Sequence, residues 1–508
     1  MSKKQLTTVL LIVIVAFIAV TGWFLYDKNY TKTENNQSKQ KMNMSMSEGN
    51  SSSNSSMEMM DQESENNVEI VEKNQKEKEL AIPPLLKADS ETDSAVEYTL
   101  TAQEGESSFI DGEKTKTLGY NGNFLGPVLR VKNGQKVTIN TENKLTSDTS
   151  FHWHGLKIPS DVDGGPHQPV KPNETKKVDF TVEQEAATLW FHPHPDGETA
   201  KQVYDGLAGV LLVEDENSDK LDIPKNYGKD DIPVIVQDRV FDNNNQLNYE
   251  SDRNEDGTQG DTLLVNGTIN PYINVSDGNI RLRLLNGSNA RNYEFSFDDG
   301  SEFKQIASDG GFLANPISLD KVMLTPGERA EIIVNTEKYK KGDVLNLMDG
   351  DSKILSLKIT KDNLKSVELP TKLNEIANED TSSLPEQKIT LKGMSHMVSI
   401  DGKTFDMNRI DLEKKKDEKE IWEIYNAPDM MGGMIHPFHI HGVQFRILSR
   451  NGKTPPENEA GWKDTVALNP DETVKLEVQF QNTGIFMYHC HNLEHEENGM
   501  MGQVKVTK

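Results

Sequence analysis

Apolar and polar residues alternate along many short stretches of the chain, and Pro, Gly or Asn residues separate these stretches. Successive side chains of a strand point to opposite faces, so the alternation predicts strands that are buried on one side. Helical possibilities are short, such as residues 198–204, and the pattern predicts an all-β protein. The clearest strands each follow a Pro-x-Glu turn: Val178, Phe180 and Val182 after Glu174; Ile332 and Val334 after Glu328; Val474, Leu476 and Val478 after Glu472.

This strand pattern recurs at long intervals. The three glutamates of the turns are 154 and 144 residues apart, and a second recurrent strand ends at Asn143, Asn286 and Asn426, which are 143 and 140 residues apart. A repeat of this length, built from strands and turns, predicts three β-sandwich domains of similar build. We place these domains at residues 93–218, 228–365 and 386–508.

The N-terminal residues differ from the rest of the chain. Lys3 and Lys4 precede an apolar run from Leu6 to Tyr26, which is long enough to span a bilayer as a helix. The run lacks a good small-residue cleavage site, so we favour an uncleaved membrane anchor over residues 1–26, with a cleaved signal peptide as the alternative. Both interpretations place the protein at the outer face of a cell envelope or outside the cell.

Residues 27–92 are rich in Asn, Ser, Lys and Glu. Such a composition cannot bury enough apolar surface to order the chain, and we expect a disordered linker. Thioethers are soft ligands that select Cu(I), so we interpret a group of methionines in this linker as a collector of cuprous ions, with compositional drift as the alternative. The methionines are Met42, Met44, Met46, Met57, Met59 and Met60.

The net charge of the chain is −26, and no basic stripe interrupts it. This balance excludes the electrostatic footprint of a nucleic-acid-binding protein. An acidic surface raises the local concentration of cationic substrates such as copper ions, or it serves only to keep the protein soluble. We expect a monomer.

Ten of the twelve histidines lie in four short segments, and one of these segments holds the only cysteine, Cys490. A lone cysteine cannot form an internal disulfide, and its histidine neighbours favour metal binding. On a strand, Cys490 would face one side while His489 and His491 face the other, so one strand can serve two metal sites. The segments are His152-Trp153-His154, His192-Pro193-His194, His436-Pro437-Phe438-His439-Ile440-His441 and His489-Cys490-His491 followed by His495.

A thiolate, two imidazoles and a weak axial thioether form the ligand set of a blue-copper centre. Cys490, His495 and Met500 supply three of these groups, and the fourth must come from another segment. The first and third repeats each carry a histidine segment nine or ten residues after the recurrent Asn, whereas the middle repeat carries none. We therefore expect the other histidines to meet between the first and third domains, with the second domain as a spacer.

These segments resemble those of the multicopper oxidases in order and spacing, over about residues 95–508. The resemblance is sharpest through residues 429–442 and 460–466. It implies three cupredoxin-like Greek-key β-sandwich domains and four copper ions. The ligand sets that it implies are His436, Cys490 and His495 with axial Met500 for type 1 copper; His152 and His439 for type 2 copper; His154, His192 and His491 for one type 3 ion; and His194, His441 and His489 for the other.

The resemblance also implies an oxidase that takes single electrons from a substrate and reduces dioxygen to water. Asp163 and Glu496 match acidic residues that assist this reduction in related oxidases. Cuprous ion is the favoured donor, with phenols, aromatic amines or ferrous ion as alternatives and a non-catalytic copper-binding protein as a further one. The candidate residues for a substrate copper are Asp429, Met430, Met431 and Met434. The chain lacks the long Met-rich insertion of copper efflux oxidases, and Gly432 stands where a carboxylate is expected.

Overall fold

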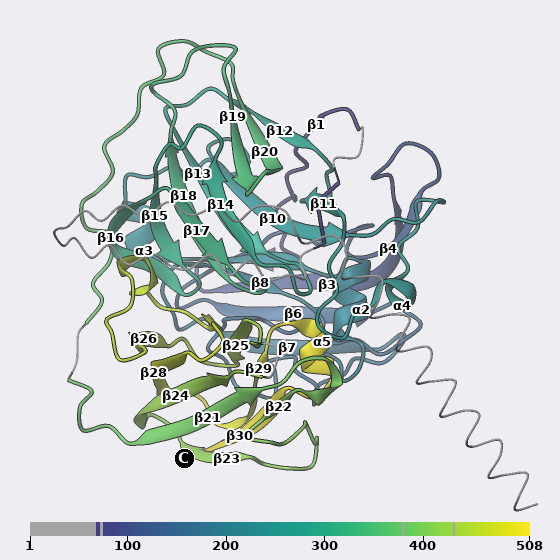
Figure 1. The fold of residues 1–508 in the computed structure, drawn as a ribbon, viewed down its shortest axis with the longest axis vertical. Coiled ribbons are helices and arrows are strands. Elements are labelled where there is room, and N and C mark those ends of the chain that lie inside the picture. Colours follow the sequence, from purple (N-terminus) through teal and green to yellow (C-terminus); the bar gives the residue numbers. More distant parts are fainter. Residues whose placement is uncertain (1–67, 72–74, 378–379, 430–431) are drawn as a thin grey trace, which may run out of the picture. The chain divides into compact units, whose positions relative to one another are not determined.

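The computed structural model describes residues 68–71, 75–377, 380–429 and 432–508, which form a mostly β structure (Figure 1). No helix in these ranges is long and apolar enough to cross a bilayer. The predicted anchor at residues 1–26, the linker as far as residue 67 and the six linker methionines lie outside the described residues. The helices are α2 (Thr199–Asp205), α3 (Glu216–Lys220), α4 (Tyr249–Asp252), α5 (Leu493–Glu497) and the short 3-10 helices η1 (Ser395–Met397) and η2 (Glu457–Glu459).

The first domain packs two sheets around Val137, Ile139 and Leu189, which are fully buried. One sheet has the order β2-β3-β6-β7 with β4 paired to β3, and the other has the order β5-β9-β8. The strands are β2 (Ser90–Glu91), β3 (Ala95–Ser107), β4 (Thr115–Tyr120), β5 (Leu129–Lys132), β6 (Lys136–Asn143), β7 (Thr175–Thr181), β8 (Ala187–Phe191) and β9 (Gly209–Glu214).

The second domain consists of two six-stranded sheets that enclose one apolar core. The first sheet is β1 (Lys78–Glu79), β12 (Pro271–Val275), β20 (Ser352–Ile359), β19 (Val344–Asp349), β14 (Tyr293–Phe297) and β17 (Lys321–Leu324). The second is β11 (Thr262–Val265), β10 (Asp231–Arg239), β13 (Asn279–Asn286), β18 (Arg329–Asn335), β15 (Phe303–Ser308) and β16 (Gly311–Leu319).

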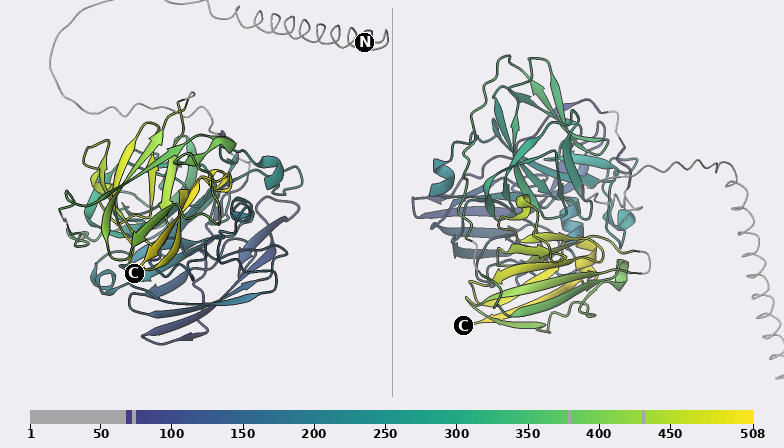
Figure 2. Two further views of the ribbon diagram at one scale, coloured as in Figure 1. Left: turned by 90° about the horizontal axis from the view of Figure 1, so that it is seen from below. Right: turned by 60° about the vertical axis from the view of Figure 1, so that its left-hand side comes forward.

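The third domain, green to yellow in Figure 2, has two five-stranded sheets. The first is β22 (Ser399–Ile400), β21 (Glu386–Lys392), β24 (Lys419–Ala427), β28 (Thr473–Gln479) and β26 (Arg446–Arg450). The second is β23 (Leu412–Lys415), β30 (Met501–Thr507), β29 (Gly484–Cys490), β25 (His436–Ile440) and β27 (Thr465–Leu468). Strands β25 and β29 of this second sheet carry histidines and the cysteine.

The three domains share a topology at the recurrent strands. In each domain the recurrent strand pairs in parallel with an earlier strand and antiparallel with the strand that follows the Pro-x-Glu turn: β3-β6-β7, β10-β13-β18 and β21-β24-β28. The end of each recurrent strand is anchored in the same way. The side chains of Asn143, Asn286 and Asn426 each donate to two main-chain carbonyls, at 2.7–3.0 Å. The repeat seen in the sequence is therefore a structural repeat.

One expectation is wrong for the last part of the predicted linker. Strand β1 pairs in parallel with β12, so the chain before residue 92 adds an edge strand to the second domain. The next residue, Leu80, is 4% exposed in the core of that domain, and Ile82 packs against the same core. These apolar side chains give the segment a hydrophobic contact that offsets the entropy of ordering it.

Candidate copper centres

The single cysteine and two histidines form a compact buried group at one end of β29. The Cys490 Sγ atom lies 3.5 Å from Nδ1 of His436 on β25 and 3.8 Å from Nδ1 of His495 on α5. The first turn of α5 is capped by Asn492, whose side chain accepts from the His495 backbone N–H. Met500 is fully buried in the same core cluster as Cys490. The predicted type 1 residues are thus brought together.

Residues on the other side of β29 face a second group. Nε2 of His489 lies 3.0 Å from Nε2 of His441 and 3.3 Å from Nε2 of His194. These three ring nitrogens belong to the first and third domains, as the repeats predict. The alternation of side chains along β29 therefore separates two possible metal sites by a single residue.

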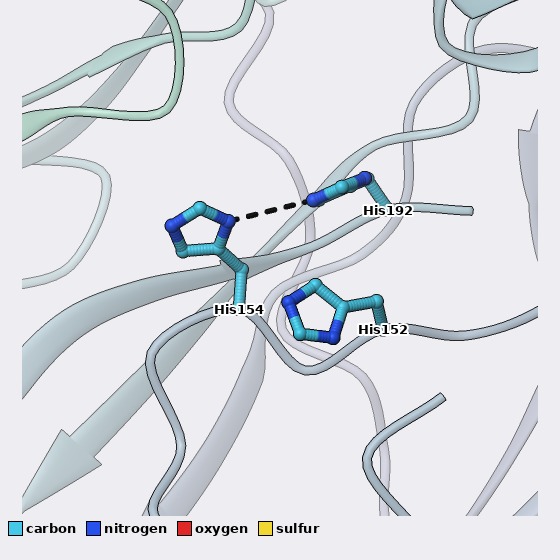
Figure 3. Close-up of side chains that lie close together, drawn as sticks. All are labelled: His152, His154 and His192. Carbon is cyan, nitrogen blue, oxygen red and sulfur yellow. Dashed lines mark hydrogen bonds between the residues drawn. The ribbon is translucent and has the colours of Figure 1, made fainter. Parts of the chain in front are cut away.

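A third group lies on the first domain, beside the second. His152, His154 and His192 point toward one another, and Nδ1 of His154 lies 3.4 Å from Nε2 of His192 (Figure 3). Backbone hydrogen bonds between His152 and His192 hold the two segments together. The ring centroid of His491 lies 5.0 Å from that of His154 and 5.3 Å from that of His192. The structure thus places all three predicted ligands of one type 3 ion in mutual contact range.

His439 of β25 joins these groups. Its ring stacks on that of His154, with centroids 3.7 Å apart, and one of its ring nitrogens lies within 4.8 Å of ring nitrogens of both His152 and His441. His152 and His439 are the predicted type 2 pair. Their Nε2 atoms are buried and have no hydrogen-bond partner.

Asp163 contacts two of these rings. Its Oδ2 lies 2.7 Å from Nδ1 of His441 and 3.4 Å from Nδ1 of His152. The turn that presents it requires glycine at position 164, where φ is +82° and a Cβ would collide with the carbonyl of Phe151. Asp163 is 3% exposed. It holds the rings from outside the histidine group, with its other oxygen, Oδ1, unpartnered.

Glu496 occupies the corresponding place beside the other histidines. Its Oε1 lies 3.3 Å from Nδ1 of His194, and its Oε2 lies 3.1 Å from Nδ1 of His489. Helix α5 carries Glu496 directly after His495, so one short helix reaches both centres. Both predicted acidic residues therefore contact imidazoles of the buried group.

Sequence reasoning missed a further carboxylate. Oδ1 of Asp464 lies 2.9 Å from Nε2 of His154, and the backbone carbonyl of Asp464 lies 2.7 Å from Nδ1 of His439. Thr465 Oγ1 lies 3.1 Å from Nε2 of His154. Trp190 stacks on His192 with centroids 4.2 Å apart. Asp464 lies within the 460–466 segment that carried the family resemblance, which was the available signal.

The chemistry of these groups fits copper. Burial, reinforced by neighbouring histidines, lowers the pKa of His154, His194, His441 and others well below the usual range, and burial lowers the pKa of His436 to about 4. Neutral imidazoles offer lone pairs, which metal binding requires. Burial, and to a lesser extent the charge of Glu496, raises the pKa of the Cys490 thiol, so its use as a thiolate requires a cation beside it. Several ring nitrogens are buried without hydrogen-bond partners: His152 Nε2, His194 Nδ1, His439 Nε2, both nitrogens of His491, and His495 Nε2.

The candidate substrate-copper residues are placed only in part. Met430 and Met431 lie outside the described residues. Met434 is half-buried, and its carbonyl accepts from the side chain of Asn426. Asp429 is half-buried, and its charge acts on His436.

Comparison with known proteins gives one family. Domain models described as multicopper oxidase match residues 101–218, 230–344 and 378–508. The multicopper oxidase mco of Staphylococcus aureus is 48% identical over 435 residues, covering 86% of this chain and 94% of that protein. The cell division protein FtsP of Escherichia coli is 36% identical over 453 residues, covering 84% and 92%. A laccase structure from Pediococcus acidilactici has a TM-score of 0.85 at 45% identity, covering 86% and 95%.

These matches span all three domains. The cofactors follow: one type 1, one type 2 and a pair of type 3 copper ions. Dioxygen and a reducing substrate are the reactants. The chain belongs to the multicopper oxidase family and is a copper-dependent oxidoreductase.

Proposed function

We propose that this oxidase takes its electrons from Cu(I) and protects the cell against copper. The observation that carries the proposal is a turn beside the type 1 residues. Helix η1 packs on α5, where the Asn498 side chain donates to the Ser395 carbonyl at 3.4 Å. Just before η1, the backbone of Gly393 hydrogen-bonds to His436. The turn therefore lies against both helix α5, which carries His495, and His436.

This turn carries thioethers. Met394 is half-buried and Met397 is 70% exposed, so the thioether of Met397 is open to solvent. A thioether contributes little to the binding of a phenol, whereas it is a preferred ligand of Cu(I). Met434 and Asp429 lie in the connection between β24 and β25. Methionine and carboxylate side chains from two segments thus border the part of the surface nearest His436.

We propose the ligand sets for the four ions that the resemblance to multicopper oxidases implies. His436, Cys490, His495 and Met500 hold type 1 copper; His152 and His439 hold type 2; His154, His192 and His491 hold one type 3 ion; and His194, His441 and His489 hold the other. When bound, these ions collect single electrons and supply the four that reduce dioxygen to two waters. Cys490 is joined by peptide bonds to His489 and His491, so one strand links the two centres covalently.

The acidic side chains supply protons and orientation. Asp163 Oδ2 holds the proton on Nδ1 of His441, which leaves Nε2 of that ring free to bind metal. Glu496 lies beside the other two rings, with its Oε1 3.3 Å from Nδ1 of His194 and its Oε2 3.1 Å from Nδ1 of His489. Reduction of dioxygen to water consumes protons, and we propose these two buried carboxyl groups as their donors.

The experiment compares donors and matched methionines. Met397→Leu should raise the KM for Cu(I) severalfold in oxygen-uptake assays and leave phenol oxidation unchanged. Met323→Leu is the control, because Met323 is also an exposed methionine, at 41%, but lies on β17 of the second domain. Met434→Leu should lower Cu(I) turnover even at saturating copper. If Met397→Leu and Met434→Leu both match the parent on Cu(I), and the parent oxidises phenols faster than Cu(I), an alternative donor is favoured.

That alternative is a laccase-type oxidase of phenols and aromatic amines, or a ferroxidase. The relative from Pediococcus acidilactici that is described as a laccase supports it. A non-catalytic copper-binding role is a further alternative. All ten clustered histidines, Cys490 and Met500 are present, and this complete ligand set argues against it.

We also propose that residues 1–26 anchor the protein at the outer face of the cell envelope as a monomer, and that the linker methionines collect Cu(I) there. Replacing all six linker methionines by Leu should weaken Cu(I) oxidation at low copper only. Membrane fractionation of cells that express the full chain tests the anchor. Recovery of the protein in the medium without residues 1–26 would indicate a cleaved signal instead.

A further inference from the structure

The second domain holds none of the proposed copper ligands, yet one of its side chains reaches the histidine group. Arg329 opens strand β18 and is completely buried. Its Nη1 and Nη2 donate to the two carboxylate oxygens of Asp464 at 2.7 and 2.6 Å. Planar, bidentate pairing of this kind fixes the orientation of a carboxylate as well as its charge.

The other N–H groups of Arg329 are also used. Nε donates to the carbonyl of Thr188 in the first domain at 3.0 Å, and Nη1 and Nη2 donate to the carbonyls of Gly327 and Asp309 in the second domain at 2.9 Å. An arginine has five N–H donors, and these contacts occupy all five. The guanidinium is therefore locked between all three domains and has no freedom to reorient.

Asp464 in turn orients two of the proposed cluster ligands, His154 and His439. Its Oδ1 faces Nε2 of His154, which places the ring proton on Nε2 and directs the lone pair of Nδ1 toward His192. The carbonyl of the same residue faces Nδ1 of His439 and leaves Nε2 of that ring as the metal-binding atom. A partner that fixes the tautomer and orientation of a histidine determines which nitrogen can bind metal.

Among the described residues, no other cation is placed to replace Arg329 beside Asp464. Its Oδ2 also accepts from the Gln444 side chain at 3.0 Å, and its Oδ1 from Thr465 at 3.0 Å, but both partners are neutral. The nearby Lys463 pairs with Asp309 and Glu328 instead, at 2.9 and 3.1 Å. Arg329 is thus the only cation that the described residues place on the Asp464 carboxylate. A buried carboxylate without a cation is strongly disfavoured.

We propose that Arg329 is a positioning residue for the copper cluster, acting through Asp464 on His154 and His439. The second domain is then part of the oxygen-reducing site and not only a spacer. This inference rests on the ligand sets proposed above but not on the choice of donor. It assigns Arg329 no contact with substrate or copper.

The test is copper retention in the full-length, copper-loaded protein. In Arg329→Lys the charge remains but the bidentate contact is lost. The affinity of the cluster site for copper, measured by competition with a chelator, should be about 10- to 100-fold weaker than in the parent. The blue type 1 absorption of the same sample is the internal reference and should be unchanged. Electron paramagnetic resonance should show an altered type 2 signal.

Arg283→Lys is the matched control. Arg283 is also a buried arginine of the second domain that bridges to Thr188, through its hydroxyl at 2.7 Å, and pairs with Asp231 and Glu331. It contacts none of the proposed ligands. A purely structural role for Arg329 predicts that the two variants lose thermal stability alike and keep the same cluster spectrum, and that result would overturn the proposal.

Asp464→Asn tests the same link from its other end and carries the test should Arg329→Lys not fold. It should release cluster copper as readily as Arg329→Lys, and the double variant should be no worse than Asp464→Asn alone. Additive losses would contradict an action of Arg329 through Asp464. Full cluster copper in His154→Ala would instead refute the ligand assignment, which separates failure of the assignment from failure of this inference.

Discussion

His439 and His489 stand directly opposite each other on the paired strands β25 and β29. The preceding cross-strand pair, Phe438 and Cys490, faces the other side of the sheet, because successive residues of a strand point in opposite directions. One pair of strands thus presents histidines on one face and the cysteine on the other. Substitutions on the two faces should separate the two functions.

Cys490→Ser should remove the blue colour and the oxidase activity together. The thiolate is the chromophore of a type 1 site, and Cys490 is also its covalent link to His489 and His491. Visible absorption and oxygen uptake measure the two effects, and the type 2 resonance signal is the control for an intact cluster. A blue and active Cys490→Ser variant would refute the copper assignment as a whole.

His192→Ala and His439→Ala should each keep the blue colour and stop oxygen reduction. Both side chains lie in the buried histidine group and not beside Cys490. A reducing substrate should still bleach the type 1 site, because electron entry is unaffected. Oxygen consumption at the parent rate by either variant would show that the ligand sets are assigned wrongly.

Met500→Leu should raise the reduction potential of the type 1 site while the blue colour persists. The thioether is a weak axial donor, and its removal withdraws electron density from the oxidised ion. A redox titration followed by absorption measures the potential. Met501→Leu is the matched control, since Met501 is also buried but belongs to β30. A shift in the control only would identify Met501 as the axial ligand.

Acid should destabilise the copper-free protein through its buried histidines. His436 has a pKa of about 4 in the folded protein, against about 6.5 in an unfolded chain. The unfolded state therefore binds a proton first, and the stability from this group is present above pH ~6.5 and lost as the pH falls toward about 4. Each such group contributes up to about 1.4 kcal/mol per pH unit.

Urea unfolding of the copper-free protein between neutral pH and pH ~5 measures this slope. His436→Gln should make it shallower by the contribution of one histidine. His396→Gln is the control, because His396 is exposed and pairs with Glu255 on the surface. The same slope in all three proteins would contradict the argument.

Gly164→Ala should destabilise the protein more than Gly197→Ala. Both glycines have positive φ, +82° and +78°, and an L-residue there costs roughly 1–2 kcal/mol. A Cβ at position 197 meets nothing, whereas one at position 164 collides with the Phe151 carbonyl and displaces Asp163. Thermal unfolding measures the difference, and equal losses would show that the turn at Asp163 tolerates the methyl group.

Local sequence patterns determined a large part of this protein. Alternation predicted strands, and the recurrence of Asn143, Asn286 and Asn426 predicted a shared topology, because one side-chain amide closes the same turn in each domain. The absence of a histidine segment from the middle repeat correctly placed the histidine group between the first and third domains. Period-two alternation at Cys490 predicted that its neighbours face a different site. These properties depend on residues close together in the chain.

Tertiary structure alone decided what depends on distant partners. Leu80 begins a short apolar run within residues 27–92, whose overall composition predicts disorder, and only the core of the second domain gives it a place to be buried. Asp464 is one acidic residue among many until folding brings it within 2.9 Å of His154, 310 residues away. Arg329 reaches Asp464 from a domain with no proposed ligand, across 135 residues. A hydrogen bond across such separations leaves no periodicity in the sequence, because its geometry exists only once the three domains have packed.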